Sequence, residues 1–520
     1  MRVLLINPAS PTGTYWSMTD LCRFIGARTL VPPLGLLTVA ALLPASWEFR
    51  LKDLNARRLD EDDWRWADLV MVSGMLVQRD NLLSVVRGAK ARGKPVAAGG
   101  PYPTSLPEEV LAAGCDFLVR GEGENAIPLF LEALKKGERR GVIEVPEKPD
   151  LAISPVPRFD LLNLRDYAIM PIQTSRGCPF DCEFCDVVSL YGRKPRYKAA
   201  SQVIAELEAL HRLGWQKEVF ICDDNFVGHK SHAKAILHKL IDWRENSGRG
   251  FGYWTQTSVD VGQDEELMDL MVRARFRNLF IGLESPDAEV LAGAGKFQNV
   301  RHPLFESLHN LKAKGLIVVG SFIIGFDHEK PGAGRRIAAF AEAADLPLVM
   351  LNLLNPLPHT RLWRRLEQEG RLHPGAADQD SFDYMKNTLT YDPERPDRDI
   401  VAEHRQAWDY LYEPGRFLSR CHRYFLELGS QRPASGRNPA RPPALLPRNL
   451  GSLLNQARDL LTLLRVSWTQ GVCSPHRGRY WRQFVDIYRR RPGNFPKYIE
   501  TLVIGEDMFR LRNSFRLREP

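Results

Sequence analysis

The sequence has no long hydrophobic run and few cysteines for its length. No stretch of eighteen consecutive apolar residues occurs among its 520 residues, which argues against a helix that spans a membrane. The opening segment, MRVLLINPAS, has the pattern of a buried strand rather than of a signal peptide, so we expect a cytoplasmic protein. Eight cysteines in this length exclude a disulfide framework. The apolar share of 44% and the charged share of 26% exclude a disordered or fibrous chain.

The chain has little charge imbalance except at its C-terminal end. Its formal net charge is +8. Positions 411–520 hold 20 basic and 8 acidic residues, a net of +12, which leaves −4 for the preceding 410 residues. Such a basic end suits an anionic partner, but by itself it does not indicate nucleic acid.

Strand and helix signals alternate over the first 140 residues. Helix-compatible stretches at 34–43, 81–92, 107–113 and 124–136 separate five apolar runs, which are RVLLIN, WEFRLKD, DLVMVSG, KPVAAGG and DFLVRGE. This alternation predicts an α/β domain with a parallel sheet covered on both faces. The Pro-rich passage at 145–157 predicts a linker.

Small and glycine-rich pieces follow three of these predicted strands. They are Ser73–Met75, Gly99–Pro101 and Gly121–Glu124. Ligands of parallel sheets bind beyond the carboxyl ends of the strands, and glycine lets the backbone approach a bulky group closely. Three such pieces in register therefore favour a ligand site over simple turns.

A second alternating series predicts an open or partial parallel barrel of six strand–helix units. Its predicted strands are IMPIQTS, EVFICDD, YWTQTSV, LFIGLES, IVVGSFIIGF and LVMLNLL. Beyond about position 370 the segments 408–429 and 453–472 are predicted to be helical, with a Pro- and Arg-rich connector at 432–449. The predicted organisation is a first domain at 1–140, a linker at 141–166, a barrel at 167–370 and a helical domain at 371–520.

Three cysteines lie close together just after the first strand of the predicted barrel, in TSRGCPFDCEFC. Zinc sites usually take four protein ligands, often as two separated pairs, and the sequence has no second cysteine pair. Three thiolates without a fourth ligand suit an iron–sulfur cluster that leaves one iron open to another molecule.

The CxxxCxxC motif, with Phe184 just before its last cysteine, resembles the signature of the radical S-adenosylmethionine (SAM) superfamily. The preceding domain resembles the cobalamin-binding domain of the class B, cobalamin-dependent methylases in PPLGLLTVAALL, SGM, GGPYPTSLPEE and GEGE. The segments LVPPLGLLTVAALLPASWEFRLKDLN and DDWRWADLVMVSGMLVQ resemble the hopanoid C-2 methylases, which carry an extra C-terminal helical domain. The resemblance covers residues 1 to about 370. It implies a flavodoxin-like cobalamin-binding domain, a partial (β/α) six-unit barrel and an α-helical domain that covers the substrate.

The resemblance also implies which residues bind the cluster and SAM. Cys178, Cys182 and Cys185 would bind a 4Fe–4S cluster whose open iron chelates SAM. Phe184 would lie near the adenine. Other SAM contacts would come from the carboxyl ends of barrel strands, at Asp223, Asp224, Gln256, Thr257 and Glu284. The segment NPLPHT at 355–360 resembles the family's PLPGT turn, with His359 in place of glycine.

Cobalamin would contact the three strand-end pieces. The residues concerned are Ser73, Gly74, Met75, Gly99, Gly100, Thr104, Gly121, Glu122, Gly123 and Glu124. Many cobalamin proteins ligate cobalt with the histidine of a DxHxxG loop, but the nearest match here is Asp53, Leu54, Asn55. The resemblance therefore implies a base-off cofactor without a protein histidine ligand.

The implied reaction moves a methyl group from SAM, via methylcobalamin, to an unactivated carbon of a hydrophobic substrate, either isoprenoid and hopanoid-like or a tetrapyrrole. A second SAM would be split to a radical that abstracts hydrogen, and no general acid or base is predicted. An external electron donor such as flavodoxin or ferredoxin is expected. The Arg-rich C-terminal helices, with Trp468 and Trp481 interleaved, predict a peripheral contact with the cytoplasmic face of a membrane, or else a packed lid with a solvated basic face.

Three other functions compete with this one. A cobalamin-dependent radical rearrangement or cyclisation without methylation would use the same cofactors. A tRNA methylthiotransferase would need a second three-cysteine cluster, but the N-terminal region has only Cys22 and Cys115. A non-enzymatic cobalamin sensor would have no use for the cysteine motif.

Overall fold

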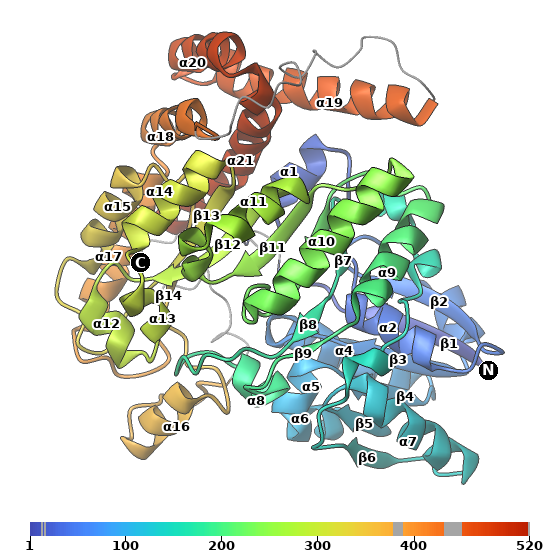
Figure 1. Cartoon of the computed structure of the whole chain (residues 1–520). Helices are drawn as coiled ribbons and strands as arrows, with labels where there is room; N and C mark the ends of the chain where they lie inside the picture. The colour runs from blue at the N-terminus through green and yellow to red at the C-terminus, as the bar shows by residue number, and fades with distance from the viewer. Residues whose placement is uncertain (12–13, 15–16, 378–387, 431–449, 518–520) are drawn as a thin grey trace. The chain divides into compact units, whose positions relative to one another are not determined.

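The chain divides into two compact units in the computed structural model (Figure 1), which describes residues 1–11, 14, 17–377, 388–430 and 450–517. The first unit contains Met1–Thr12, Val31–Phe251 and Asn355–Asp392. The second contains Gly13–Leu30, Gly252–Leu354 and Pro393–Pro520. The predicted connector at 432–449 lies outside the described residues.

The first unit holds a sheet of six parallel strands in the order β2-β1-β3-β4-β5-β6. The strands are β1 (Arg2–Asn7), β2 (Glu48–Asp53), β3 (Leu69–Ser73), β4 (Val96–Gly99), β5 (Phe117–Arg120) and β6 (Gly141–Glu144). This is the flavodoxin-like order with one strand added, so the predicted fold class is confirmed. Strand β6 is not among the predicted strands, because its four residues lie at an edge of the sheet and bury only Ile143.

Alternate residues of these strands enter two separate cores. In β1, Val3 and Leu5 face one core, whereas Leu4 and Ile6 face the other, as the two-residue period of a strand requires. Helices α2 (Leu34–Leu42) and α7 (Gly123–Lys135) line the first core. The helices on the second core are α3 (Glu61–Trp66), α4 (Arg79–Ala91), α5 (Pro101–Ser105) and α6 (Pro107–Ala112). The sheet is therefore covered on both faces, as predicted.

The six barrel strands also lie where the sequence predicts them. They form a second sheet in the order β14-β13-β12-β11-β10-β7. The first unit contributes β7 (Met170–Ile172) and β10 (Val219–Ile221), with α9 (Ala200–Arg212) and α10 (Lys230–Ser247). The second unit contributes β11 (Tyr253–Thr257), β12 (Phe276–Glu284), β13 (Ile317–Ile324) and β14 (Leu348–Leu353), with α11 (Glu265–Arg273), α14 (Leu304–Lys314) and α15 (Ala333–Ala343).

The C-terminal region is helical, as predicted. Its helices are α17 (Asp397–Leu411), α18 (Pro414–Glu427), α19 (Leu450–Trp468), α20 (Arg477–Arg490) and α21 (Phe495–Leu517). The segment 408–429 is broken between α17 and α18, because Pro414 disfavours helical backbone in the residue before it and starts the second helix. No helix of the described residues is both long and apolar enough to cross a membrane.

A short N-terminal helix, α1 (Thr19–Phe24), belongs to the second unit and was not predicted. At its beginning the Asp507 carboxylate of α21 accepts hydrogen bonds from the N–H groups of Asp20 and Leu21, at 2.7 and 2.8 Å. At its end Arg465 of α19 donates to the carbonyl of Phe24 at 2.9 Å. The carboxylate and the guanidinium complement the two ends of the helix dipole, so the C-terminal helices stabilise α1.

His404 of α17 joins the C-terminal helices to the second sheet and predicts a pH dependence. Its Nε2 lies 3.0 Å from the carbonyl of Leu351 in β14, while its Nδ1 is buried without a hydrogen-bond partner in the described structure. Burial lowers the pKa of His404 from 6.5 to about 4. A histidine held neutral in this way stabilises the fold fully above pH 6.5, and that contribution is lost as the pH falls to 4. This pKa shift corresponds to about 3 kcal/mol of the free energy of unfolding.

We therefore expect the protein to lose more free energy of unfolding between pH 7 and pH 4 than a His404→Gln variant does. Denaturant titrations of both proteins across this range measure the difference. If the free energy of unfolding falls equally with pH in the two proteins, His404 is not the source of the pH dependence.

Candidate functional site

The three cysteines lie on one loop whose ends are paired with each other. The loop connects β8 (Ser175–Arg176) to β9 (Arg196–Tyr197), which form a short antiparallel ribbon. Gly177 opens the loop at a φ of +92°, and a Cβ there would lie 2.9 Å from the carbonyl oxygen of Gly192. The N–H of Cys178 donates to that same carbonyl at 3.3 Å. The sequence therefore closes the loop at its base and needs glycine at its first position.

The electrostatics of these thiols favour a positively charged group among them. All three are half-buried. Burial raises the pKa of Cys178 and Cys185, and the neighbouring thiolates raise it further. Three thiols without a fourth ligand fit an iron–sulfur cluster, whose irons would offset these charges. In the described part of the chain, no three His, Cys, Asp or Glu side chains converge as the ligands of one metal ion would, so the ligand set stays a prediction.

Two arginines tie this loop to the flavodoxin-like sheet, and neither is among the residues predicted from the sequence. Arg176 Nη1 donates to Glu122 Oε2 and to Glu124 Oε2, each at 2.8 Å. Arg196, its partner across the β8–β9 ribbon, has Nη2 2.8 Å from Glu122 Oε1. Both carboxylates follow β5, at the start of α7, and their side chains are 4% and 2% exposed. We call these four residues the buried clamp.

The clamp gives Glu122 and Glu124 partners within the protein, and their contact with cobalamin stays a prediction. Burial by itself would raise the pKa of Glu124, but the hydrogen bonds and the charge of Arg176 lower it overall. Ser154 also donates to Glu124, at 2.9 Å. Both carboxylates are thus paired with arginine, and they hold the base of the cysteine loop. The only signal in the sequence is an arginine directly before GCPFDCEFC.

Asp223 and Asp224 follow β10, beside the same loop. Asp223 is fully buried and accepts hydrogen bonds from the N–H groups of Thr174 and Ser175 at 2.6 and 3.0 Å, and from both of their hydroxyls. It therefore joins the end of β10 to the chain after β7. Asp224 accepts from the N–H of Gly177 at 2.7 Å, and burial raises its pKa to about 7. Neither residue caps a helix, because α10 begins at Lys230.

The remaining predicted SAM residues are divided between the units. Phe184 is half-buried in the cysteine loop, whereas Gln256 and Thr257 end β11 in the second unit. Thr257 Oγ1 is buried and has no hydrogen-bond partner in the described structure, so its hydroxyl is available to a ligand.

Glu284 ends β12 in the second unit, at a φ of +61°. It pairs with Lys296, whose Nζ lies 2.5 Å from Oε1. A Cβ at Gly282 would lie 2.4 Å from Glu284 Oε1 and 2.8 Å from Lys296 Nζ. Glycine at 282 therefore makes room for this pair. Lys296 is not among the residues predicted from the sequence.

The three glycine-rich pieces of the first unit lie together, as predicted. The N–H of Tyr102 donates to the carbonyl of Gly74 at 3.0 Å, and the N–H of Gly121 donates to Thr104 Oγ1 at 3.1 Å. Gly100 has a φ of +95°, and a Cβ there would meet Ser73 Oγ at 2.3 Å. Hydrogen bonds and close approach thus join the carboxyl ends of β3, β4 and β5, with Met75 exposed at their edge. This is the surface on which a ligand of such a sheet binds.

In the loop after β2, the Asn55 side chain is held by hydrogen bonds within the protein. Asn55, at the position of the ligating histidine in DxHxxG, donates through Nδ2 to the carbonyl of Pro8 at 3.1 Å and to Asp53 Oδ1 at 2.8 Å. Its Oδ1 accepts from the N–H of Ser10 at 2.8 Å. All polar atoms of the Asn55 side chain are therefore engaged. These residues fit a cobalamin without a lower ligand from the protein.

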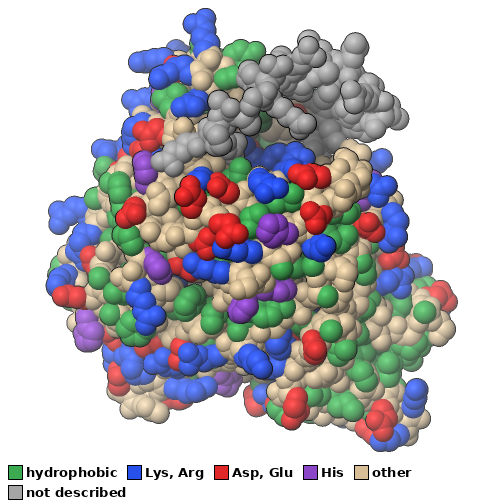
Figure 2. Space-filling view, in the orientation of Figure 1, with side chains coloured by type: hydrophobic (Ala, Val, Ile, Leu, Met, Phe, Trp, Pro, Cys, Tyr) green, Lys and Arg blue, Asp and Glu red, His purple; other side chains and the backbone are tan. Residues whose placement is uncertain are grey.

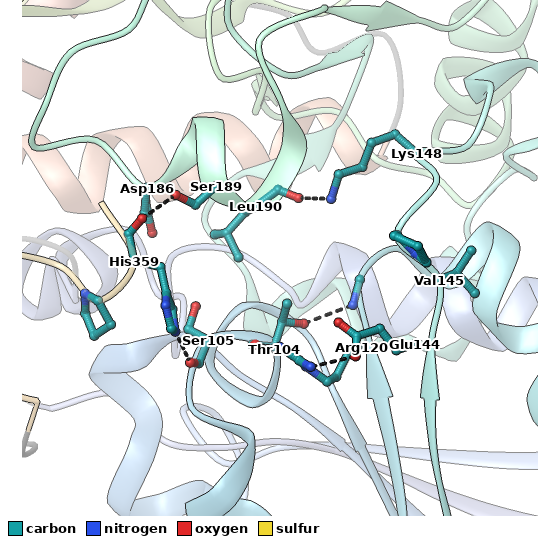
Figure 3. A pocket seen from close by; sticks show the side chains of 13 residues that line it. Thr104, Ser105, Arg120, Glu144, Val145, Lys148, Asp186, Ser189, Leu190 and His359 are labelled. Atoms are coloured by element: carbon teal, nitrogen blue, oxygen red, sulfur yellow. Dashed lines mark hydrogen bonds and ion pairs between the residues drawn. The ribbon is translucent and has the colours of Figure 1, made fainter. Parts of the chain in front are cut away.

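A pocket of about 200 Å³ lies between the strand-end pieces and the end of the cysteine loop (Figure 3). Thr104 and Arg120 line one side, and Asp186 and Leu190, which follow Cys185, line the other, where Lys148 donates to the carbonyl of Leu190. His359 reaches into it from the PLPHT turn, and its Nε2 lies 2.6 Å from the carbonyl oxygen of Ser105. His359 has a φ of +65°, the left-handed conformation that favours glycine. Histidine therefore adopts here the backbone conformation for which glycine is the usual residue.

Three protein families match successive parts of the chain. The B12 binding domain matches residues 24–131, the Radical SAM superfamily matches 172–341, and a domain of unknown function matches 360–519. The fold and the site thus define a radical SAM enzyme with a cobalamin-binding domain.

Two relatives resemble the chain over nearly its whole length. An uncharacterized methyltransferase of Synechocystis sp. is 44% identical over 517 residues, which cover 99% of this chain and 93% of the relative. The hopanoid C-2 methylase of Rhodopseudomonas palustris is 31% identical over 492 residues, which cover 92% and 88%. The chain therefore belongs to the cobalamin-dependent radical SAM methyltransferases, the family of the hopanoid C-2 methylase.

The fold is also that of a solved enzyme. The cobalamin-dependent SAM radical enzyme OxsB, with aqua-cobalamin and SAM bound, superposes with a TM-score of 0.60 at 14% identity, over 99% of this chain and 83% of that chain. The predicted family, fold and enzyme class are confirmed, as are the three cofactors: a 4Fe–4S cluster, SAM and cobalamin.

Proposed function

We propose that this methyltransferase acts on an unactivated carbon of a hydrophobic, polycyclic isoprenoid of the hopanoid kind. The observation that carries the proposal is the extent of the alignment with the hopanoid C-2 methylase, which covers 92% of the chain. The domain of unknown function spans 160 residues, 360–519, so an alignment that leaves out only 8% of the chain must include most of it. The region in which we expect substrate identity to lie is therefore shared with an enzyme named for a hopanoid substrate.

Bound cluster, SAM and cobalamin supply the chemistry: reductive cleavage of SAM to a hydrogen-abstracting radical, and transfer of a methyl group to the substrate. In our proposal Cys178, Cys182 and Cys185 hold the cluster. Phe184, Asp224, Gln256 and Thr257 are the proposed SAM contacts. Two observations support this: the Thr257 hydroxyl has no hydrogen-bond partner among the described residues, and Asp224 lies at the base of the cysteine loop, where it accepts from the N–H of Gly177.

The strand-end residues Ser73, Gly74, Gly99, Gly100, Thr104 and Gly121 are the proposed cobalamin surface, with Met75 and Gly123 beside it. Asp223, Glu122, Glu124 and Glu284 already have buried partners in the protein. We propose that they act on the cofactors indirectly, by holding the loops.

We also propose an external one-electron donor such as flavodoxin or ferredoxin. The five cysteines outside the loop are scattered along the sequence, so no second cysteine motif supplies an internal electron carrier. A bilayer is where a polycyclic isoprenoid is found, so we propose that the enzyme works as a peripheral protein at the cytoplasmic face of a membrane.

Anaerobic reconstitution tests the substrate class. The protein, loaded with iron, sulfide, cobalamin and SAM and supplied with a reductant, is incubated with detergent-dispersed pentacyclic hopanoid or with a tetrapyrrole, and the products are analysed by mass spectrometry. We expect methylated hopanoid together with 5′-deoxyadenosine and S-adenosylhomocysteine in equal amounts.

Methylated tetrapyrrole alone would contradict the substrate class. Deoxyadenosine without S-adenosylhomocysteine would favour the rearrangement instead. The Cys182→Ala variant serves as the control for products that do not depend on the cluster.

A further inference from the structure

Helix α19 exposes an apolar stripe along one side. The side chains of Leu460, Leu461, Leu464 and Trp468 are 56%, 51%, 56% and 64% exposed. At about 100° per residue these four positions fall within an arc of roughly 100° of the helix surface. The opposite side is packed, because Val466 is fully buried and Gln470, in the turn that follows, donates to the carbonyl of Leu502 at 3.1 Å. The stripe is thus the outward side of a helix whose inward side is anchored.

Helix α20 repeats this arrangement. Trp481, Val485 and Tyr488 follow the i, i+4, i+7 spacing of one helix side and are 42%, 41% and 61% exposed. The other side is anchored by Tyr480 and Ile487, which are fully buried. The two helices are coupled through the turn between them, where Trp481 Nε1 donates to the carbonyl of Gly471 at 2.9 Å. We call the exposed residues of α19 and α20 the C-terminal apolar face.

Arginines border this face. Positions 477–491 hold six arginines and a single acidic residue, Asp486. That aspartate is engaged with His422, 2.8 Å away, and with Arg490. On α20, Arg482 and Arg489 lie roughly 80–100° around the helix from Trp481, on the flank of the apolar stripe. Figure 1 shows α19 and α20 together at one end of the second unit, and Figure 2 shows Lys and Arg side chains gathered over α20.

We infer that the C-terminal apolar face docks on a lipid bilayer that contains anionic lipids. Exposed leucines next to Trp and Tyr, with arginines at the flank, have the chemistry of an interfacial helix: the apolar side enters the boundary between headgroups and acyl chains, the aromatic rings lie at that boundary, and the cations meet phosphates. A second copy of this chain is a poorer occupant. Two such faces would bring their arginines together without acidic partners.

This inference deepens the proposed function by naming the surface through which the enzyme would reach a membrane-resident substrate. The binding itself needs neither substrate nor cofactor turnover. The protein can therefore methylate a hopanoid without binding vesicles, and it can bind vesicles without methylating a hopanoid.

Vesicle sedimentation of the full-length protein tests the docking face. The vesicles are pure phosphatidylcholine, or phosphatidylcholine in which roughly one lipid in three is the anionic phosphatidylglycerol. We expect at least tenfold tighter binding to the anionic vesicles at low salt, reduced several-fold at about 0.5 M salt. A Leu464→Asp/Trp468→Asp variant and an Arg482→Gln/Arg489→Gln variant should each lose at least tenfold.

The matched control is Leu129→Asp/Arg139→Gln, which changes an exposed leucine (46%) and an exposed arginine of the first unit and should bind like the parent protein. Unchanged thermal unfolding and unchanged SAM cleavage in detergent establish that the variants fold. The inference is overturned if anionic vesicles do not bind the parent at low salt, or if both face variants bind as the control does. It is also overturned if the parent dimerises in solution and the face variants are monomers.

Discussion

Replacing Cys182 by alanine is expected to abolish reductive cleavage of SAM. The loop between Arg176 and Arg196 supplies three thiols and no fourth ligand, so the loss of one leaves too few to hold a cluster with an open iron. Even loss of residues that support a metal site costs about 10- to 100-fold, so the loss of a ligand should reduce 5′-deoxyadenosine formation by at least about 100-fold. Chromatography measures the deoxyadenosine formed. The iron and sulfide content and the electron paramagnetic resonance signal of the reduced protein report whether the cluster is bound.

Two other cysteines provide the controls for this prediction. Cys473 is exposed, and Cys222 follows β10 beside Asp223, where its thiol donates to the carbonyl of Ile172 at 3.1 Å. Cys473→Ser and Cys222→Ala should keep the cluster signal and cleave SAM within a few-fold of the parent. If the Cys182→Ala protein still cleaves SAM at the parent rate, this loop does not bind the cluster.

The second large effect is expected at Arg176, the centre of the buried clamp. Arg176→Met leaves the carboxylates of Glu122 and Glu124 buried with less compensation, since Arg196 reaches only Glu122. Breaking a buried ion pair by removing one partner typically costs about 3–5 kcal/mol. We expect a loss of that size in the free energy of unfolding at pH 8, measured by denaturant titration of the protein without cofactors.

The charge argument can be separated from the loss of packing. Adding Glu122→Gln and Glu124→Gln to Arg176→Met removes the uncompensated charges, so the triple variant should recover part of the lost stability. Arg158 pairs with Asp160 at the surface, and Arg158→Met should cost less than about 1 kcal/mol. If the triple variant is no more stable than Arg176→Met, the clamp is not an electrostatic one.

The clamp also links stability to function. Its carboxylates follow β5 of the flavodoxin-like sheet and its arginines flank the cysteine loop, so it fixes the loop base relative to the proposed cobalamin surface within the first unit. Variants that fold but have a loosened clamp should form more deoxyadenosine than S-adenosylhomocysteine. The reason is that SAM cleavage at the cysteine loop and methyl transfer at the cobalamin surface would no longer take place at a fixed distance from each other.

Much of this architecture could be predicted from local patterns. Alternating runs such as RVLLIN and DLVMVSG identified every strand of the first sheet except β6, and all six barrel strands. β6 escaped because its four residues carry little apolar signal. The break at Pro414 follows a local rule as well, although the prediction ran a single helical segment across it.

The candidate site also has one part that local sequence patterns predict and another part that they do not. The cysteine spacing and the glycine-rich strand ends are contiguous motifs, so the sequence alone points to a cluster loop and to a ligand surface. The buried partners are not contiguous. Arg176 meets Glu122 across 54 positions of the chain, and Asp507 meets α1 across 487.

By itself, then, the sequence determined the two alternating α/β regions, the three-thiol loop and the basic C-terminal end, because each depends on residues that are near one another along the chain. Only the tertiary structure decided which charged residues near the motifs are free and which are paired. It made Glu122, Glu124, Asp223 and Glu284 partners of buried groups and left the Thr257 hydroxyl without a hydrogen-bond partner among the described residues. It also turned the apolar residues of α19 and α20 outward. The physical reason is that burial and ion pairing depend on neighbours brought together by folding, which no local spacing specifies.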